Sequence, residues 1–251
     1  MELNHIYNQE CVSGMKEHIP SGTIDLVVTS PPYNLGIDYD SYNDKQPYSD
    51  YLDWCENWLK ECYRVLKPDG RICINHYLSC GTSDFRFAPI LDINYISCHK
   101  IGFKHHGIAL LDDRTLTKRT AWGSWLSASA PYLNSPYEVV LVLFKDRWKK
   151  DNPGENNILS KEFQEISMGT WKVHGEPRTN HPAPFPKEVP RKCIRFFSYV
   201  GDIVLDPFMG IGTTALAAKQ NGRKYIGFEI SENYYKQCLL NLSQSCITEE
   251  V

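Results

Sequence analysis

The chain is predicted to adopt an α/β fold, with a mostly parallel sheet and helices on both of its faces. Strand and helix signals alternate along the whole sequence, as they do where crossover helices join parallel strands. Two strand signals, "IDLVVTS" (24–30) and "YEVVLVLFK" (137–145), are nearly continuous apolar runs. Such runs indicate strands that are buried on both faces of a sheet.

The first half of the chain contains one especially clear helix. Apolar residues recur with a helical period through "SDYLDWCENWLKECYRVLK" (49–67), and the "KPDG" that follows provides Pro and Gly as a stop signal. Strands are expected at 5–10, 24–30 and 71–77, and helices at 11–19, 49–67 and 84–101. The segment "IGFKHHGIALL" follows the last of these helices.

The second half is expected to return to strand–helix alternation after a long irregular stretch. Residues 151–190 are rich in proline and have little periodicity, which favours irregular structure. Beyond 137–145, strands are expected at 202–208 and 224–230, and helices at 191–200, 212–222 and 232–245.

Composition is ordinary for a soluble globular protein. Of the 251 residues, 42% are hydrophobic and 23% are charged, which suits a single domain spanning 1–251. No apolar stretch approaches the roughly 20 residues of a membrane helix, and no signal peptide is visible, so we expect an intracellular protein. The nine cysteines form no CxxC pair, which predicts free, mostly buried thiols and no metal site.

Charge is unevenly distributed along the chain. Residues 1–50 are acidic, whereas residues 98–150 carry nine Lys or Arg against four Asp or Glu. A basic segment on a mildly acidic chain is compatible with phosphate binding and equally with an ordinary solvated surface. Charge alone therefore leaves both interpretations open.

The end of the strand at 24–30 carries an unusual rigid hook. Ser30 is followed by Pro31 and Pro32, which fix the backbone and remove two N–H donors, and then by Tyr33. A simple turn needs no such constraint, because Gly or Asn would make it more easily. The hook therefore marks a candidate site at the strand end.

A second candidate site lies near the C-terminus, in "LDPFMGIGTT". A strand ends at Asp206, a turn through Gly210 and Gly212 follows, a helix begins near Thr213, and the next strand ends at Glu229. Glycines allow close approach of a ligand, and an acidic residue at the second strand end suits ribose hydroxyls. A third glycine is missing, and the carboxylate before the turn would repel a pyrophosphate. It suits the cationic end of S-adenosylmethionine.

Together these stretches resemble an identifiable family. "TSPPY" is similar to the catalytic motif of DNA amino-methyltransferases, "LDPFMGIGTT" to their S-adenosylmethionine motif, and "HPAPFPKEVPRKCIRFFSYVGD" (181–202) to the segment that leads into the cofactor strand. The catalytic motif comes first, which is the order of the permuted β class. The resemblance implies a circularly permuted, Rossmann-like methyltransferase fold. It divides the chain into a catalytic half (1–80), a DNA-reading part (about 80–175) and a cofactor-binding half (about 178–245).

The resemblance also implies roles for the hook. Ser30 Oγ and the Pro31 carbonyl would accept hydrogen bonds from an exocyclic base amine, Pro32 would hold that carbonyl outward, and Tyr33 would stack on the extruded base. The cofactor-binding residues that it implies are Asp206, Pro207, Phe208, Gly210, Gly212, Thr213, Glu229, Glu10, His181, Phe185 and Pro186. The family usually has Asp where this chain has Glu10.

DNA contacts are expected from the basic middle of the chain. The candidates are Arg114, Lys118, Arg119 and Trp122 in "DDRTLTKRTAWGSW", and Arg147 and Lys149 in "KDRWKK". The expected partner is double-stranded DNA in the cytoplasm of a bacterium or archaeon. A cognate restriction endonuclease and a homodimer remain open.

Three functions compete at this point. Ser rather than Asp before Pro-Pro-Tyr favours a cytosine-N4 methyltransferase, within a restriction–modification system, over an adenine-N6 enzyme of the same class. A non-catalytic protein that binds DNA or S-adenosylmethionine is the alternative of another kind. RNA also remains open as a substrate.

Overall fold

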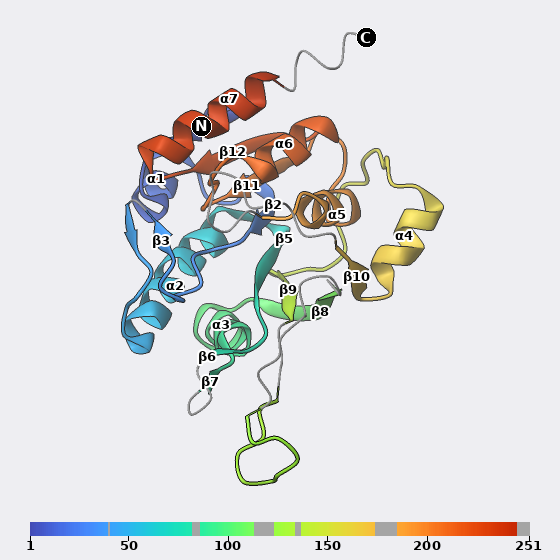
Figure 1. Cartoon of the computed structure of the whole chain (residues 1–251). Helices are drawn as coiled ribbons and strands as arrows, with labels where there is room; N and C mark the ends of the chain where they lie inside the picture. The colour runs from blue at the N-terminus through green and yellow to red at the C-terminus, as the bar shows by residue number, and fades with distance from the viewer. Residues whose placement is uncertain (40, 82–85, 113–122, 134–136, 174–184, 245–251) are drawn as a thin grey trace.

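The computed structural model of the chain describes residues 1–39, 41–81, 86–112, 123–133, 137–173 and 185–244. An eight-stranded sheet runs through its centre (Figure 1). In sheet order its strands are β1 (His5–Tyr7), β12 (Lys224–Phe228), β11 (Ile203–Asp206), β2 (Ile24–Thr29), β5 (Leu66–Tyr77), β9 (Glu138–Phe144), β8 (Lys104–Asp112) and β10 (Thr170–Lys172).

The two ends of the chain share one half of this sheet. The N-terminal strands β1 and β2 pair in parallel with the C-terminal strands β12 and β11. Every pairing in the sheet is parallel except those of β9, which runs antiparallel to both β5 and β8. The predicted permuted arrangement is therefore observed, and the carboxyl ends of β1, β12, β11, β2 and β5 meet at one edge.

Helices cover both faces of the sheet, and each of them except α4 overlaps a helix predicted from the sequence. One face carries α1 (Cys11–His18), α2 (Tyr48–Val65), α3 (Pro89–Tyr95) and the π-helix η1 (Ile96–Ile101). The other carries α4 (Ser160–Ser167), α5 (Glu188–Phe197), α6 (Thr213–Gln220) and α7 (Glu232–Gln244).

Successive residues of a buried strand point to opposite faces of the sheet, so each strand contributes side chains to the hydrophobic core on either face. In β2, Val27 packs on the side of α1 and α2, whereas Leu26 and Val28 pack on the side of α5 and α6. All six β2 residues are buried, as the apolar run predicts. Strand β2 is thus held from both faces at the centre of the sheet, which makes its carboxyl end a rigid platform.

The main difference from the sequence prediction lies within 151–190. This stretch was expected to be irregular, yet it contains α4 and the edge strand β10. Ile166 of α4 and Trp171 of β10 are buried against the sheet, and Trp171 Nε1 donates to the Ile166 carbonyl. Tertiary packing therefore orders a segment whose own sequence has only a weak pattern.

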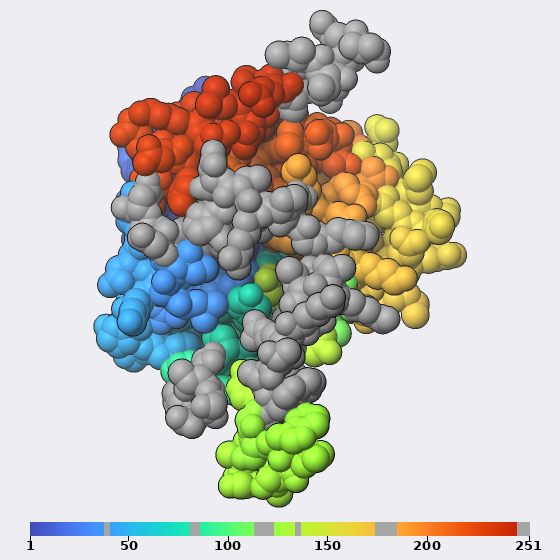
Figure 2. Space-filling model, viewed as in Figure 1, coloured from blue at the N-terminus to red at the C-terminus, as the bar shows by residue number. Residues whose placement is uncertain are grey.

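Two small strand pairs and one projecting segment complete the described structure. The pairs are β3 (Asp38–Tyr39) with β4 (Tyr42–Asn43), and β6 (Cys80–Gly81) with β7 (Arg86–Phe87). Residues 123–133 project from the body of the molecule (Figure 2). The eight described cysteines are free, and within the described ranges no helix is long and apolar enough to span a membrane.

Candidate active site

The Ser30–Tyr33 hook lies at the carboxyl edge of the sheet, directly after β2. Pro31 is buried, and the carbonyl of Pro32 accepts a 3.0 Å hydrogen bond from the Tyr51 hydroxyl. Tyr51 is fully buried on α2, so this helix fixes the position of the hook through that hydrogen bond. Its hydroxyl also lies 2.9 Å from His76 Nε2.

Replacing Tyr51 with phenylalanine tests this support. We expect Tyr51→Phe to lower the free energy of unfolding by about 1–2 kcal/mol, because the partly buried Pro32 carbonyl loses its donor. Methyl transfer should also slow, by roughly tenfold, because the hook loses a fixed contact. Chemical denaturation and single-turnover rates measure the two effects. Tyr95→Phe, on an exposed tyrosine, is the matched control, and wild-type values for both variants would contradict the assignment.

Side chains from three strand ends surround the Tyr33 hydroxyl. It lies 2.9 Å from Ser30 Oγ and donates to Glu138 Oε2 at 3.2 Å, and it accepts from Asn75 Nδ2 at 2.5 Å. The Tyr33 ring packs on His76, with ring centroids 4.2 Å apart. These contacts hold the tyrosine in one orientation at the site.

Burial governs the ionisation of this cluster. It raises the pKa of the Tyr33 hydroxyl well above its usual value, and the negative charge of Glu138 adds to the effect. Burial also lowers the pKa of His76 to about 3. Tyr33 is therefore a neutral phenol and His76 a neutral imidazole at physiological pH.

Asp206 ends β11, the strand next to β2, and connects the two candidate sites. Its Oδ1 accepts from the Thr29 hydroxyl at 2.7 Å and from the Phe208 amide at 3.0 Å, and its Oδ2 accepts from the Thr214 hydroxyl at 2.6 Å. Asp206 is only 2% exposed. Its oxygens thus bind the protein's own turn and the neighbouring strand, and a contact with the cationic end of a cofactor stays a prediction.

The buried Asp206 predicts a pH dependence of stability. Burial raises its pKa from 3.8 to about 6, so between these values the folded protein binds a proton that the unfolded chain does not. Its contribution to stability therefore grows as pH falls from 6 towards 4, by up to roughly 3 kcal/mol. We expect the melting temperature of the wild type, relative to Asp206→Asn, to rise between pH 7.5 and pH 5. A difference that is constant or falls over this range would contradict the assignment.

The turn after β11 depends on two glycines with positive φ. Gly210 has φ +54° and Gly212 has φ +94°, and a Cβ on Gly212 would lie 2.6 Å from Cys238 Sγ in α7. Glu229, just after β12, accepts from the Gly210 amide at 2.7 Å and from the Ser231 amide at 2.8 Å. The glycine turn after β11 is thus observed where the sequence pattern predicts it, and it is also closely packed and tied to the next strand end.

The other predicted cofactor residues that the structure describes follow neighbouring strands or lead into neighbouring helices. Glu10 follows β1 and accepts from the first amides of α1, Val12 N–H and Ser13 N–H. Phe208 packs against Trp54 and Trp58 of α2. Pro207 is buried beside it, whereas Phe185 and Pro186 lead into α5, and His181 lies outside the described residues.

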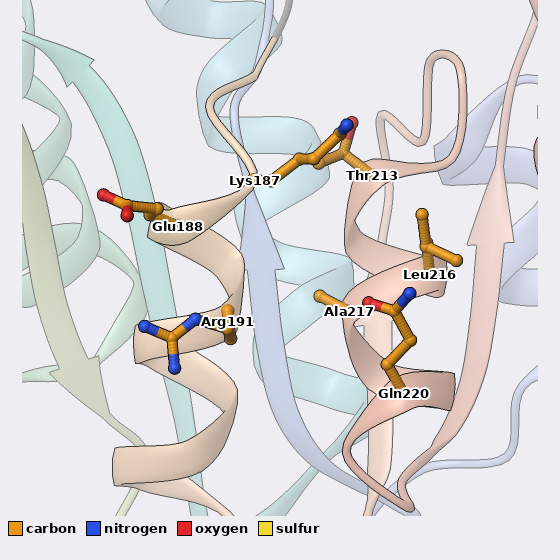
Figure 3. A pocket seen from close by; sticks show the side chains of 7 residues that line it. All are labelled: Lys187, Glu188, Arg191, Thr213, Leu216, Ala217 and Gln220. Atoms are coloured by element: carbon orange, nitrogen blue, oxygen red, sulfur yellow. The ribbon is translucent and has the colours of Figure 1, made fainter. Parts of the chain in front are cut away.

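A shallow groove separates α5 from α6 (Figure 3). Lys187 and Arg191 line it from the α5 side, and Thr213 and Leu216 line it from α6. The Lys187 side chain extends towards Thr213, the residue that follows the glycine turn (Figure 3). Residues just before α5 therefore lie close to the glycine turn, although they are distant in sequence.

These residues fit S-adenosylmethionine. Glu229 and Glu10 follow neighbouring strands at one edge, where carboxylates can accept from a ribose diol or an amine. The backbone of the glycine turn permits close approach at Gly210, where no side chain stands, whereas the space beside Gly212 is filled by Cys238. No group of His, Cys, Asp and Glu suited to a metal ion occurs within the described ranges.

Two of the predicted DNA-binding residues lie far from the hook. Because β9 is antiparallel to β5, the chain after Phe144 reaches the amino ends of the parallel strands, where Asp146 N–H donates to the Pro68 carbonyl. Arg147 and Lys149 lie there, roughly 20 Å from the other end of β9. A DNA contact by these two residues would therefore be made away from the hook, and it stays a prediction. Arg114, Lys118, Arg119 and Trp122 lie outside the described residues.

Sequence reasoning missed Tyr51, Asn75, His76 and Glu138. Asn75 and His76 are buried polar residues inside the apolar strand "RICINHY", and that interruption is the signal that was available. Glu138 gave a weaker signal, because it is only an acidic residue at the first position of a buried strand.

Comparison with known proteins agrees with this geometry. The family model of N6 and N4 methyltransferases, described as DNA methylase, matches residues 24–240, which include both the hook and the glycine turn. The chain belongs to this DNA methylase family. The resemblance is thereby confirmed at the level of the N6 and N4 class.

Three similar proteins illustrate the relationship. Type II methyltransferase M.MjaVI of Methanocaldococcus jannaschii is 43% identical to this methylase over 162 residues, which are 64% of this chain and 81% of the relative. Type II methyltransferase M.BglII of Bacillus subtilis is 31% identical over 246 residues, 92% of this chain and 67% of the relative. The structure of TTHA0409 from Thermus thermophilus, complexed with S-adenosyl-L-methionine, superposes with a TM-score of 0.75 at 26% identity, covering 96% of this chain and 93% of that one. The predicted α/β fold is thus confirmed.

Proposed function

We propose that this methylase transfers a methyl group from S-adenosylmethionine to the exocyclic N4 of cytosine in a short duplex DNA sequence. The observation that carries the proposal is the direct link between the two sites. The hook starts one residue after Thr29, and the Thr29 hydroxyl donates to Asp206 at the start of the glycine turn. This link supports the proposal, because it joins the residues proposed to bind the base to those proposed to bind the cofactor at one edge of the sheet.

The residues of the hook have complementary tasks in this proposal. Ser30 Oγ and the Pro31 carbonyl accept hydrogen bonds from the base amine, and Tyr33 stacks on the extruded base. When bound, the cofactor supplies an electrophilic methyl group on a sulfonium. Glu229, Glu10 and the glycine turn hold it beside the hook, so the reactants are positioned before reaction.

Adenine-N6 is the alternative target. The matching family covers both N6 and N4 methyltransferases, and Ser30 is the observation that favours N4. Asp112 ends β8 and Glu138 begins β9, both at the site's edge, and the nearness of Arg114 and Arg119 to Asp112 in the sequence supports them as DNA readers. The type II names of M.MjaVI and M.BglII support a role in restriction–modification.

Nucleoside analysis tests the proposal. The protein is incubated with unmethylated duplex DNA and methyl-labelled S-adenosylmethionine, and the digested nucleosides are identified by mass spectrometry. N4-methylcytosine is the expected product. N6-methyladenine would overturn the proposed base, and the absence of both from duplex DNA, single-stranded DNA and RNA would overturn the enzymatic function itself.

A further inference from the structure

The polar cluster behind the hook determines which way its hydroxyl groups point. Asn75 Nδ2 lies 2.5 Å from Tyr33 Oη and 2.7 Å from Glu138 Oε2, and Glu138 Oε2 lies 3.2 Å from Tyr33 Oη. An amide NH₂ group can only donate, and an ionised carboxylate can only accept. The Asn75 amide nitrogen therefore donates to both Tyr33 and Glu138, and the Tyr33 hydroxyl uses its single proton in the hydrogen bond to Glu138 Oε2.

This arrangement leaves one direction for the contact between Tyr33 and Ser30. Their oxygens are 2.9 Å apart. The Tyr33 O–H already donates to Glu138, and one of the Tyr33 lone pairs accepts from Asn75. The remaining lone pair must accept the hydroxyl proton of Ser30, so the lone pairs of Ser30 stay available for another donor.

We propose that Glu138, acting through Tyr33, makes Ser30 an obligate hydrogen-bond acceptor towards the amino group of the target base. The inference rests on the proposed function and adds Glu138 to it as a positioning residue. Glu138 is the first residue of β9, and its oxygen is brought to the hook because β9 pairs with β5, where Tyr77 is opposite Glu138.

An acceptor-only serine has two chemical consequences. A freely rotating hydroxyl could donate to the amino nitrogen and engage the lone pair that must attack the methyl group. It could also donate to a carbonyl, and so admit a base such as thymine in place of cytosine. With its proton held by Tyr33, Ser30 supports neither contact, so it selects an amino group and leaves the nitrogen lone pair free.

Burying this polar cluster is unfavourable for folding, which indicates that the cluster has a role besides packing. Asn75 is only 2% exposed, and its Oδ1 has no hydrogen-bond partner within the described ranges. Burying an unpaired amide oxygen is unfavourable by about 1–3 kcal/mol. The two bonds from Nδ2 to Tyr33 and Glu138 hold the amide in this orientation despite that cost.

A double-mutant cycle tests the proposal through the single-turnover rate of methyl transfer to unmethylated plasmid DNA. Glu138→Met should lower the rate by roughly 100-fold, because Tyr33 then donates to Ser30, occupies one of its two lone pairs and leaves the Ser30 proton free to point at the base amine. Tyr33→Phe should lower it by about tenfold, because Ser30 is free to rotate. The double variant should be no slower than Glu138→Met alone, since the competing donor is gone. Affinity for S-adenosylmethionine and melting temperature should match those of Glu165→Met, an exposed control.

A second readout does not depend on turnover. In protein labelled with ¹³C at tyrosine Cζ, the resonance missing from Tyr33→Phe should shift in Glu138→Met and stay in place in Glu165→Met. An unshifted resonance, losses that multiply in the double variant, or an equal loss of cofactor affinity would each overturn the proposal. A shifted resonance in a wild type that methylates no base would support the hydrogen-bond arrangement and overturn the proposed function instead.

Discussion

Ser30→Ala is expected to reduce the rate of methyl transfer by roughly 1,000-fold, the scale seen when one hydrogen-bonding group that stabilises a transition state is removed. The alanine variant retains the Pro31 carbonyl but loses the Oγ acceptor. The amino group then lacks one of the two bonds that favour a pyramidal, nucleophilic nitrogen. Single-turnover kinetics with labelled S-adenosylmethionine measure the effect.

Cofactor binding should survive this substitution. Asp206, Glu229 and the glycine turn do not contact Ser30 in the hydrogen bonds described above, so calorimetry should show wild-type affinity for S-adenosylmethionine. Ser49→Ala, on an exposed serine in the first turn of α2, is the matched control. Wild-type transfer by Ser30→Ala would show that the serine has no role in the reaction.

Gly212→Ala is expected to have the second-largest effect, on both stability and cofactor binding. An alanine at φ +94° is strained, and its Cβ would lie 2.6 Å from Cys238 Sγ. We expect the free energy of unfolding to fall by about 2–4 kcal/mol, from backbone strain and overpacking together. Affinity for S-adenosylmethionine should fall at least tenfold, because the turn can relieve the clash only by moving. Denaturant unfolding and calorimetry measure the two quantities.

Gly201→Ala is the control that distinguishes the effect of backbone strain alone from the effect of strain within the turn after β11. Gly201 has φ +85°, but a Cβ there would meet no atom within 4 Å. It precedes β11, at the end of the strand opposite the cofactor turn. This variant should lose stability through strain alone and keep wild-type cofactor affinity. Equal losses of affinity in the two variants would contradict a special role for Gly212.

The two motifs could be identified from the sequence because local chemistry defines them. The pair Pro31–Pro32 fixes the backbone wherever it occurs, and Gly210 and Gly212 permit the positive φ values that the turn after β11 adopts. The buried strands were predicted for a similar reason. The apolar run of β2 has no polar face, so it can be stable only between two layers of helices.

What surrounds these motifs depends on contacts between distant residues. Glu138 reaches Tyr33 across 105 positions of sequence, and Thr29 reaches Asp206 across 177. Asp206 illustrates both kinds of feature. The local sequence predicts its position before the turn, whereas the orientation of its carboxylate depends on Thr29 of the neighbouring strand. Arg147 shows this dependence again, because the antiparallel direction of β9 carries that residue to the opposite edge of the sheet.

The sequence by itself therefore determined the fold class and the positions of the proline hook and the glycine turn, since these depend on backbone rules and apolar periodicity within short segments. The permuted order and the roles of the two motifs were implied by their resemblance to a known family. The tertiary structure alone decided which side chains converge on the hook and which way their protons point. Strand order and direction bring those residues together, and no local pattern encodes either of them.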